Sequence, residues 1–349
     1  MDRFRVGLSG DFFRADGSPC FPEFDLAPLK RRSDVEVSIL APGPAITADQ
    51  TKALDALILL LPRVTPESFH PNGRLALIAR FGVGYDNVDV AACSARDVAL
   101  AITPDGVRRP VAVSIITLML ALTGKLFVKD GLARRGPEGW AEKTMHNGVG
   151  LVGRTLGSLG IGNIGAEMFR LAKPFDMKFI AHDPYADAAL AADLDVELVE
   201  LEELFRRSDV LSINCPLSDS TRHLVNAERL ALMKRTAYLI NTARGPIVDQ
   251  AALTRVLAQR RIAGAGLDVL EQEPPDANDP LLKLDNLIVT PHALCWTDQI
   301  FSGNGASDVR AVLRVMAGEV PGAVVNGDVR ERPGWRAKLL SYRERFNPG

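Results

Sequence analysis

One glycine-rich segment, Gly160-Ile161-Gly162-Asn163-Ile164-Gly165, constrains this chain more than any other part of its sequence. A strand-like run, 155–159, precedes it, and a helix-like run, 166–172, follows it. Gly160 permits a tight turn, Gly162 lets the backbone approach a pyrophosphate, and Gly165 lets the helix pack closely on the strand. The helix N-terminus then offers N–H groups and the positive end of its dipole to phosphate. The segment therefore predicts a dinucleotide-binding βαβ unit.

Asp183 selects between the two nicotinamide dinucleotides. It lies 18 residues after Gly165, at the end of the next strand-like run, 179–182. A carboxylate at this position can accept hydrogen bonds from both ribose hydroxyls, and it repels a 2′-phosphate. The residues that follow, 184–186, include no arginine that could bind that phosphate. We therefore expect NAD rather than NADP.

Size and composition exclude several classes of protein. A chain of 349 residues predicts about two domains, and a net charge of −2 argues against a nucleic-acid-binding surface. The longest apolar run, 111–122, is shorter than the ~18 residues of a membrane span, and no signal-peptide pattern precedes the first strand. The four cysteines lie far apart and show no metal-binding spacing. We expect a cytoplasmic protein without a resident metal, nucleic-acid partner or membrane partner.

Short apolar runs alternate with helix-like stretches in two series. The first series has candidate strands at 5–8, 35–40, 56–60 and 75–79, and the second at 155–159, 178–182, 210–214, 237–241, 264–269 and 287–290. Strands separated by helices predict parallel sheets covered on both faces. The expected fold is α/β, with two Rossmann-like domains that each contain a doubly wound parallel sheet.

One of the two expected domains is formed by two separate segments of the chain. Residues 1–104 and 293–326 form a discontinuous substrate domain, 105–292 form the NAD-binding Rossmann domain, and 327–349 form a solvated or surface-draped tail. An apolar helix over 111–123, with Pro110 in its N-terminal turn, is expected to be buried between domains or subunits.

Four polar side chains follow candidate strands of the second series. Arg244, Asp268, Glu273 and His292 lie at or beyond strand ends. Ligands of open α/β sheets bind outside the carboxyl ends of the strands, so one crevice can hold all four side chains. An imidazole, a carboxylate and a guanidinium together suit proton transfer to an anionic substrate.

The chain resembles the D-isomer-specific 2-hydroxyacid dehydrogenase family from about residue 35 to about residue 326. The resemblance rests on five motifs in the family's order: 80–89, the glycine segment with Asp183, 241–245, 268–274 and Pro291-His292. It implies NAD-dependent interconversion of a small D-2-hydroxy acid and its 2-oxo acid, an active-site cleft between the two domains, and a homodimer.

The resemblance also implies residue roles. His292 is the acid/base, and Glu273 orients its imidazole and favours the cation; Glu271 competes for that role, but the family places its glutamate directly before proline. Arg244 binds the substrate and polarises its carbonyl group. The backbone N–H groups of Val83 and Gly84 hold the substrate carboxylate. The implied cofactor contacts are Gly160, Gly162, Asn163, Ile164, Gly165, Asp183, Cys215, Pro216, Thr221, Thr242, Ala243 and Asp268.

Two departures from the family pattern concern the substrate. Trp296 places a large ring where a small residue is common, so we expect it to line the substrate pocket or, alternatively, to pack at an interface. The basic pair Arg108-Arg109 could meet an acidic substrate, although a solvated helix N-terminus is the simpler interpretation. Two alternatives to the main function stay open: an NAD(H)-sensing interaction protein of the corepressor type, and a dehydrogenase of phosphite or another small anion on the same scaffold.

Overall fold

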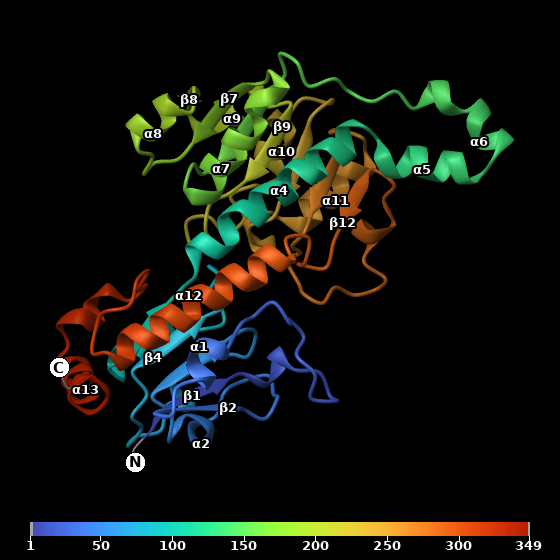
Figure 1. Ribbon diagram of the computed structural model, residues 1–349. Helices are drawn as coiled ribbons and strands as arrows, with labels where there is room; N and C mark the ends of the chain where they lie inside the picture. Colours follow the sequence, from blue (N-terminus) through green and yellow to red (C-terminus); the bar gives the residue numbers. More distant parts are fainter. Residues whose placement is uncertain (1–2, 348–349) are drawn as a thin grey trace. The chain divides into compact units, whose positions relative to one another are not determined.

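The computed structural model describes residues 3–347 of the chain (Figure 1). They form two compact units: unit 1 contains the segment up to Val107 and the segment from Trp296, and unit 2 contains Arg108–Cys295. Each unit has its own sheet, and every strand pairing within both sheets is parallel. The predicted fold class, α/β with two Rossmann-like domains, is confirmed.

The sheet of unit 1 has five strands among the described residues, in the order β2-β1-β3-β4-β5. The strands are β1 (Phe4–Leu8), β2 (Val35–Ile39), β3 (Ala56–Leu59), β4 (Leu77–Arg80) and β5 (Ala99–Ala101). The helices are α1 (Ala27–Lys30), α2 (Ala48–Thr51), α3 (Val90–Ala95), α12 (Asp298–Met316) and α13 (Pro333–Phe346). The four predicted strands are present, and β5, which spans only three residues, is the strand that the sequence interpretation missed.

The C-terminal segment is part of the core of unit 1, so the expectation of a solvated or surface-draped tail is wrong. One side of α13 is buried through Trp335, Leu339 and Tyr342. The indole N–H of Trp335 donates to the carbonyl of Ala76 at 2.9 Å, which satisfies its polar atom inside the core. The tail therefore adds an apolar helix to the sheet rather than a mobile extension.

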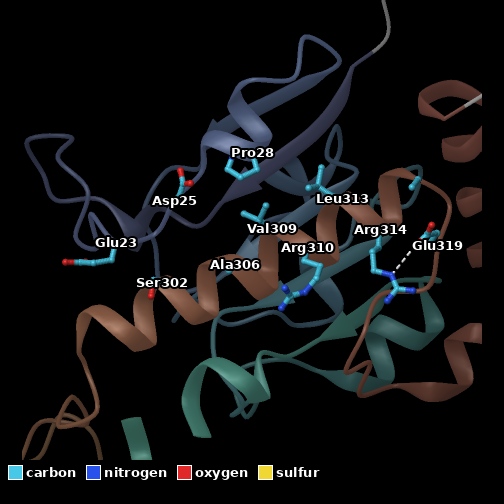
Figure 2. Close-up of a pocket in the computed structure, with 11 residues that line it drawn as sticks. Glu23, Asp25, Pro28, Ser302, Ala306, Val309, Arg310, Leu313, Arg314 and Glu319 are labelled. Atoms are coloured by element: carbon cyan, nitrogen blue, oxygen red, sulfur yellow. Dashed lines mark ion pairs between the residues drawn. The ribbon is translucent and has the colours of Figure 1, made fainter. Parts of the chain in front are cut away.

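A groove of about 600 Å³ runs along α12 on the surface of unit 1 (Figure 2). Its floor is apolar and includes Val309 and Leu313, and its rim is charged. Arg314 on this rim pairs with Glu319 at 3.2 Å, as Figure 2 shows. The opposite side of α12 packs on β4 and is buried.

The sheet of unit 2 has seven strands among the described residues, in the order β12-β11-β10-β9-β6-β7-β8. The strands are β6 (Thr155–Leu159), β7 (Lys178–His182), β8 (Val196–Leu198), β9 (Val210–Ile213), β10 (Tyr238–Asn241), β11 (Gly264–Leu267) and β12 (Leu287–Val289). The helices are α5 (Leu126–Arg134), α6 (Pro137–Ala141), α7 (Asn163–Ala172), α8 (Ala188–Asp193), α9 (Leu201–Arg207), α10 (Ala227–Leu232) and α11 (Gln250–Ala258). The strand order reverses between β6 and β9: β7 and β8 follow on one side, and β10, β11 and β12 follow on the other. Such a switch point is where these sheets bind dinucleotides.

Helix α4 (Pro104–Thr123) begins seven residues earlier than predicted, and Pro110 lies inside it rather than at its N-terminal turn. Ala112, Ile115, Met119 and other apolar residues on one side of α4 are buried, so the helix is only partly surrounded by protein. With 20 residues, the helix is long and apolar enough to cross a membrane by length and composition alone. However, 61% of its most apolar stretch is buried inside the structure. A buried core helix has the same properties.

Candidate active site

The glycine segment joins β6 to α7, and two of its glycines are required by the protein's own backbone. Gly160 has φ +98°, and a Cβ there would lie 2.9 Å from the backbone nitrogen of Cys215. A Cβ on Gly165 would lie 2.6 Å from the carbonyl oxygen of Gly160. Gly162 differs, because a Cβ there would meet no atom of the chain within 4 Å. The space over Gly162 is therefore open, as a pyrophosphate would need.

The N-terminus of α7 offers hydrogen-bond donors over this space. Gly162 is the N-cap residue of this helix and supplies no side chain to accept from the first turn. The first N–H groups of a helix lack intrahelical partners, and those of Asn163 and Ile164 are among them. An anion at this point would accept from these groups and gain from the helix dipole.

Asp183, at the end of β7, lies against the same segment. Its Oδ2 accepts from the backbone N–H of Ile161 at 3.0 Å, and its Oδ1 accepts from the N–H of Tyr185 at 2.9 Å. These two bonds fix the carboxylate beside the glycine segment and leave lone pairs on both oxygens for further donors. Ribose hydroxyls are donors of that kind, so the position of Asp183 fits the NAD interpretation.

Thr242 provides a further observation that fits a cofactor. Its hydroxyl oxygen is buried and has no hydrogen-bond partner among the described residues. A buried polar atom without a partner is costly unless a ligand or water satisfies it. The carboxamide of a nicotinamide could do so. The contacts predicted for Ala243 and Asp268 with the cofactor stay predictions.

The loop after β9 contains the other predicted cofactor residues. The Thr221 hydroxyl donates to the carbonyl of Pro216 at 2.7 Å and accepts from the N–H of Ser218 at 2.7 Å. Thr221 therefore closes this loop, and its contact with a cofactor stays a prediction. Burial raises the pKa of the Cys215 thiol to about 12, so Cys215 is a packing residue rather than a nucleophile.

Arg244 lies just beyond β10, in a turn that Asn241 shapes. The side chain of Asn241 donates to the carbonyl of Arg244 at 2.9 Å and accepts from the N–H of Ala243 at 3.0 Å. The guanidinium Nη1 of Arg244 donates to the carbonyl of Ala243 at 2.7 Å. The next residue, Gly245, is required because a Cβ there would lie 1.9 Å from the carbonyl oxygen of Leu270. The arginine turn is thus packed directly on the segment that leads to Glu273.

His292 and Glu273 form the central pair of the site. Nδ1 of His292 lies 2.8 Å from Oε2 of Glu273, and Oε1 of Glu273 accepts from the N–H of Leu270 at 2.8 Å. Burial alone would raise the pKa of Glu273, but the bonds from His292 and Leu270, together with the charge of Arg244, lower it. Glu273 is therefore a carboxylate at neutral pH and accepts the Nδ1 proton. The other ring nitrogen of His292, Nε2, is left for chemistry.

The competing glutamate, Glu271, has a different partner. Its Oε1 lies 2.6 Å from Nε2 of His223, and its Oε2 accepts from the N–H of Gln250 at 3.2 Å. The geometry therefore pairs Glu273, not Glu271, with His292. His223 is half-exposed and holds this second pair.

Asp268 has a structural role that the sequence interpretation missed. Its buried carboxylate accepts from the Thr290 hydroxyl at 2.6 Å and from the N–H groups of Ala293 and Leu294, each at 3.1 Å. These bonds enclose His292, whose φ of +55° lies in the left-handed region. Asp268 thus holds the backbone that presents the imidazole. The signal available in the sequence was only its place at a strand end.

The predicted substrate residues of unit 1 lie in the loop after β4. Gly82 is buried, and Val83 and Gly84 are half-buried. Within residues 3–347, the N–H groups of Val83 and Gly84 donate no hydrogen bond. Two neighbouring unsatisfied N–H groups can hold one carboxylate.

Two other sequence candidates have partners within their own unit. Arg109 pairs with Glu167 at 2.6 Å, which supports a structural role for it. Trp296 contacts Phe21 and Phe301 edge-on, with ring centroids 5.4 and 5.7 Å away, and 44% of its side chain is exposed. In the described part of the chain, no group of three or more His, Cys, Asp or Glu side chains could hold a metal ion.

Comparisons with known proteins agree with this geometry. Residues 116–293 match the family model described as "D-isomer specific 2-hydroxyacid dehydrogenase, NAD binding domain". The chain is 35% identical over 313 residues to a glyoxylate reductase of Korarchaeum cryptofilum, covering 88% of this chain and 94% of that protein. It is 37% identical to a D-3-phosphoglycerate dehydrogenase of Methanocaldococcus jannaschii, covering 79% of this chain but only 52% of that protein.

Solved structures of similar proteins extend the comparison to the fold. The TT0316 protein of Thermus thermophilus superposes with a TM-score of 0.79 at 30% identity, covering 92% of this chain and 100% of that one. A glyoxylate reductase of Paecilomyes thermophila superposes with a TM-score of 0.77 at 27% identity, covering 93% and 99%. The cofactor is NAD, and the reaction interconverts a hydroxy acid and an oxo acid. The chain belongs to the D-isomer-specific 2-hydroxyacid dehydrogenase family.

Proposed function

We propose that this protein reduces a small, unphosphorylated 2-oxo acid to its D-2-hydroxy acid, with His292 as the proton donor. The observation that carries the proposal is the bond between His292 Nδ1 and the Glu273 carboxylate at 2.8 Å. This bond fixes the ring orientation and favours the imidazolium form, which has a second N–H to donate from Nε2.

His292 and Glu273 would together provide the proton for the reduction. NADH, when bound, supplies a hydride to the carbonyl carbon of the substrate. As the carbonyl oxygen gains charge, the Nε2–H of His292 gives it a proton, and Glu273 stabilises the imidazolium before that transfer. In the reverse direction, neutral His292 takes the hydroxyl proton. His292 and Glu273 therefore act as one acid/base pair in both directions.

Arg244 and the loop after β4 would bind and polarise the substrate. The planar guanidinium of Arg244 can donate to the carbonyl oxygen and to the carboxylate of a 2-oxo acid together. The N–H groups of Val83 and Gly84, which lack partners within residues 3–347, would donate to the carboxylate of a 2-oxo acid. Donors aimed at the carbonyl oxygen lower the barrier because charge develops there during the reaction.

Three observations favour a small substrate without a phosphate. Several relatives are named glyoxylate reductase, among them those of Korarchaeum cryptofilum and Thermofilum pendens. Trp296, anchored on Phe21 and Phe301, would give the substrate an apolar wall, which offers a phosphate no partner. Arg109 is engaged by Glu167, so it is a poor candidate for a phosphate contact.

The test is an NADH-oxidation panel with glyoxylate, hydroxypyruvate, pyruvate, 3-phosphohydroxypyruvate and a bulkier 2-oxo acid. We expect kcat/KM to be highest for an unphosphorylated acid. Efficient use of 3-phosphohydroxypyruvate would refute the substrate assignment. Tight NADH binding without turnover of any acid would favour the dinucleotide-sensing alternative.

We also propose that the protein is a homodimer that associates through unit 2. Helices α5 and α6 extend away from the sheet of this unit (Figure 1), and they expose Leu126, Phe127 and Trp140 at 57%, 62% and 60%. Val113 and Leu120 on α4 add further exposed apolar surface, at 46% and 43%. Large apolar side chains exposed in this number are typical of an interface.

Light scattering coupled to size exclusion tests the dimer. A double variant, Phe127→Ser with Trp140→Ser, should elute as a monomer if helices α5 and α6 form the interface. A wild-type monomer at micromolar concentration would refute the proposal. Cytoplasmic localisation and the lack of nucleic-acid and membrane partners stay predictions from the sequence.

A further inference from the structure

The loop that follows β4 is fixed at its start by a double hydrogen bond to Thr103. The N–H of Gly82 donates to the Thr103 hydroxyl at 2.8 Å, and the N–H of Thr103 donates to the carbonyl of Gly82 at 3.0 Å. Thr103 is 1% exposed. Both polar groups of Gly82 are therefore satisfied by one residue, and the N–H groups of Val83 and Gly84 come next in the chain.

The Thr103 hydroxyl is itself oriented by α12. It donates to the side-chain oxygen of Asn304 at 2.8 Å, and Asn304 is 2% exposed. The contact depends on a close approach of backbones, because a Cβ on Gly106 would lie 2.2 Å from Asn304 Oδ1, and a Cβ on Gly303 would lie 2.9 Å from the Gly106 Cα. A hydroxyl that donates to one partner becomes a better acceptor for another, so the two bonds strengthen each other.

Gly82 has a conformation that needs such support. Its φ is +132°, which L side chains rarely adopt, and a Cβ there would lie 1.9 Å from Nη1 of Arg80. Nη1 of Arg80 also bonds to the carbonyl of Phe81. The direction of the next two N–H groups is therefore set by a backbone turn that surrounding side chains hold in place.

We propose that Asn304, acting through the hydroxyl of Thr103, is a positioning residue that orients the N–H groups of Val83 and Gly84 toward the substrate carboxylate. The inference rests on the proposed function, because it takes the 2-oxo acid carboxylate as the ligand of this loop. It adds a residue of α12, more than 200 positions away in the sequence, to the residues that determine substrate affinity.

The pair of variants Thr103→Val and Thr103→Ser tests this relay, that is, the hydrogen bonds that connect Asn304 through the Thr103 hydroxyl to Gly82. Valine keeps the shape of threonine but removes the hydroxyl, whereas serine keeps the hydroxyl. Carboxylate binding acts on the ground state and the transition state alike, so its loss raises KM more than it lowers kcat. We expect Thr103→Val to raise KM for the 2-oxo acid roughly tenfold with kcat within about twofold. Thr103→Ser should restore KM, and the inhibition constant of oxamate, a carboxylate analogue, should change in the same ratio.

A matched control separates this effect from a loss of stability. Thr51 is also buried in unit 1, at 2% exposure, and its hydroxyl donates to the carbonyl of Ser68 at 2.7 Å. Thr51→Val removes a buried hydroxyl far along the chain from this loop, so it should lower the melting temperature and leave KM unchanged. NADH affinity, measured by fluorescence, should be the same in all variants.

The outcomes are distinct. If Thr103→Val does not fold, Asn304→Ser shortens the side chain that accepts from the Thr103 hydroxyl, and the KM of that variant decides. An unchanged KM in a folded variant, or equal effects of Thr103→Val and Thr51→Val on KM, would overturn the inference. A wild-type enzyme that binds NADH but neither binds oxamate nor turns over any 2-oxo acid would instead refute the proposed function.

Discussion

Replacing Glu273 by glutamine tests the acid/base pair most directly, since it removes the charge and nearly preserves the shape. Glu273 Oε2 lies 2.8 Å from His292 Nδ1, and the two side chains are 37% and 46% exposed. Two unit charges about 4 Å apart interact by roughly 1 kcal/mol in water and roughly 4 kcal/mol at an effective dielectric constant of 20. For a pair exposed to this extent, solvent screening places the loss near the lower end, at about 1–2 kcal/mol.

This loss should appear in the rate of the reduction reaction. The imidazolium of His292 donates the proton, and the Glu273 carboxylate stabilises that cation. Without the carboxylate this stabilisation is lost, and about 1.4 kcal/mol corresponds to a tenfold lower rate. At pH 7.5 we expect kcat to fall by about one order of magnitude, and His292→Ala should cost two to four orders.

Glu271→Gln is the matched control. It makes the same chemical change two residues away, where the carboxylate pairs with His223. Its kcat should equal that of the wild type. An unchanged kcat in Glu273→Gln, or an equal fall of kcat in Glu271→Gln, would show that this pairing does not control the proton donor.

Other variants test the cofactor site, the core and the substrate pocket. Asp183→Ala should narrow the preference for NADH over NADPH, which is read from the ratio of their kcat/KM values, and a wild type that favours NADPH would refute the role of this carboxylate. Gly162→Ala should weaken NADH binding at least tenfold with an unchanged melting temperature, because the added Cβ enters space that no atom of the chain occupies. Burial raises the pKa of Asp308 well above its ordinary value, with the charge of Arg80 acting in the opposite direction. The free energy of unfolding should therefore decrease as the pH rises through the folded-state pKa, by up to about 1.4 kcal/mol per pH unit, and urea titrations of Asp308→Asn should show a smaller decrease. Trp296→Ala should change the ranking of 2-oxo acids, whereas lost stability with the ranking intact would mean that the indole only packs on Phe21 and Phe301.

The sequence predicted the parts of the fold that depend on local pattern. Buried strands of four or five residues bounded by glycine or polar residues were found in both sheets. The two strands that were missed, Ala99–Ala101 and Val196–Leu198, have only three residues each and therefore show no periodicity. Each of the two strands lies at the edge of its sheet, where β5 pairs with β4 and β8 pairs with β7. Such pairing between distant segments cannot be read from a local sequence pattern.

Long-range packing explains the other errors. The start of α4 was placed after Pro110 because proline usually ends or begins a helix, yet the helix continues through it from Pro104. The C-terminal residues look polar in sequence, and only the contact of Trp335 with Ala76, across more than 250 positions, shows that the helix belongs to the core. Glu273 was chosen over Glu271 as the partner of His292 because of a family pattern. The physical grounds came only from the structure, which pairs Glu273 with His292 and Glu271 with His223.

The features that point most clearly to a ligand are those that the fold itself does not need. Gly160 is required by its positive φ and by the backbone of Cys215, so its presence would be explained in a protein that binds nothing. Gly162 is not required in this way, because its φ of −68° suits any residue and the space around it is empty of protein. The Thr242 hydroxyl is buried without a partner, a cost that folding alone gives no reason to retain. Gly162 leaves space unused and Thr242 costs stability, so a bound molecule gives the physical reason for both residues. We expect that molecule to be long enough to contact Gly162 and Thr242 at the same time.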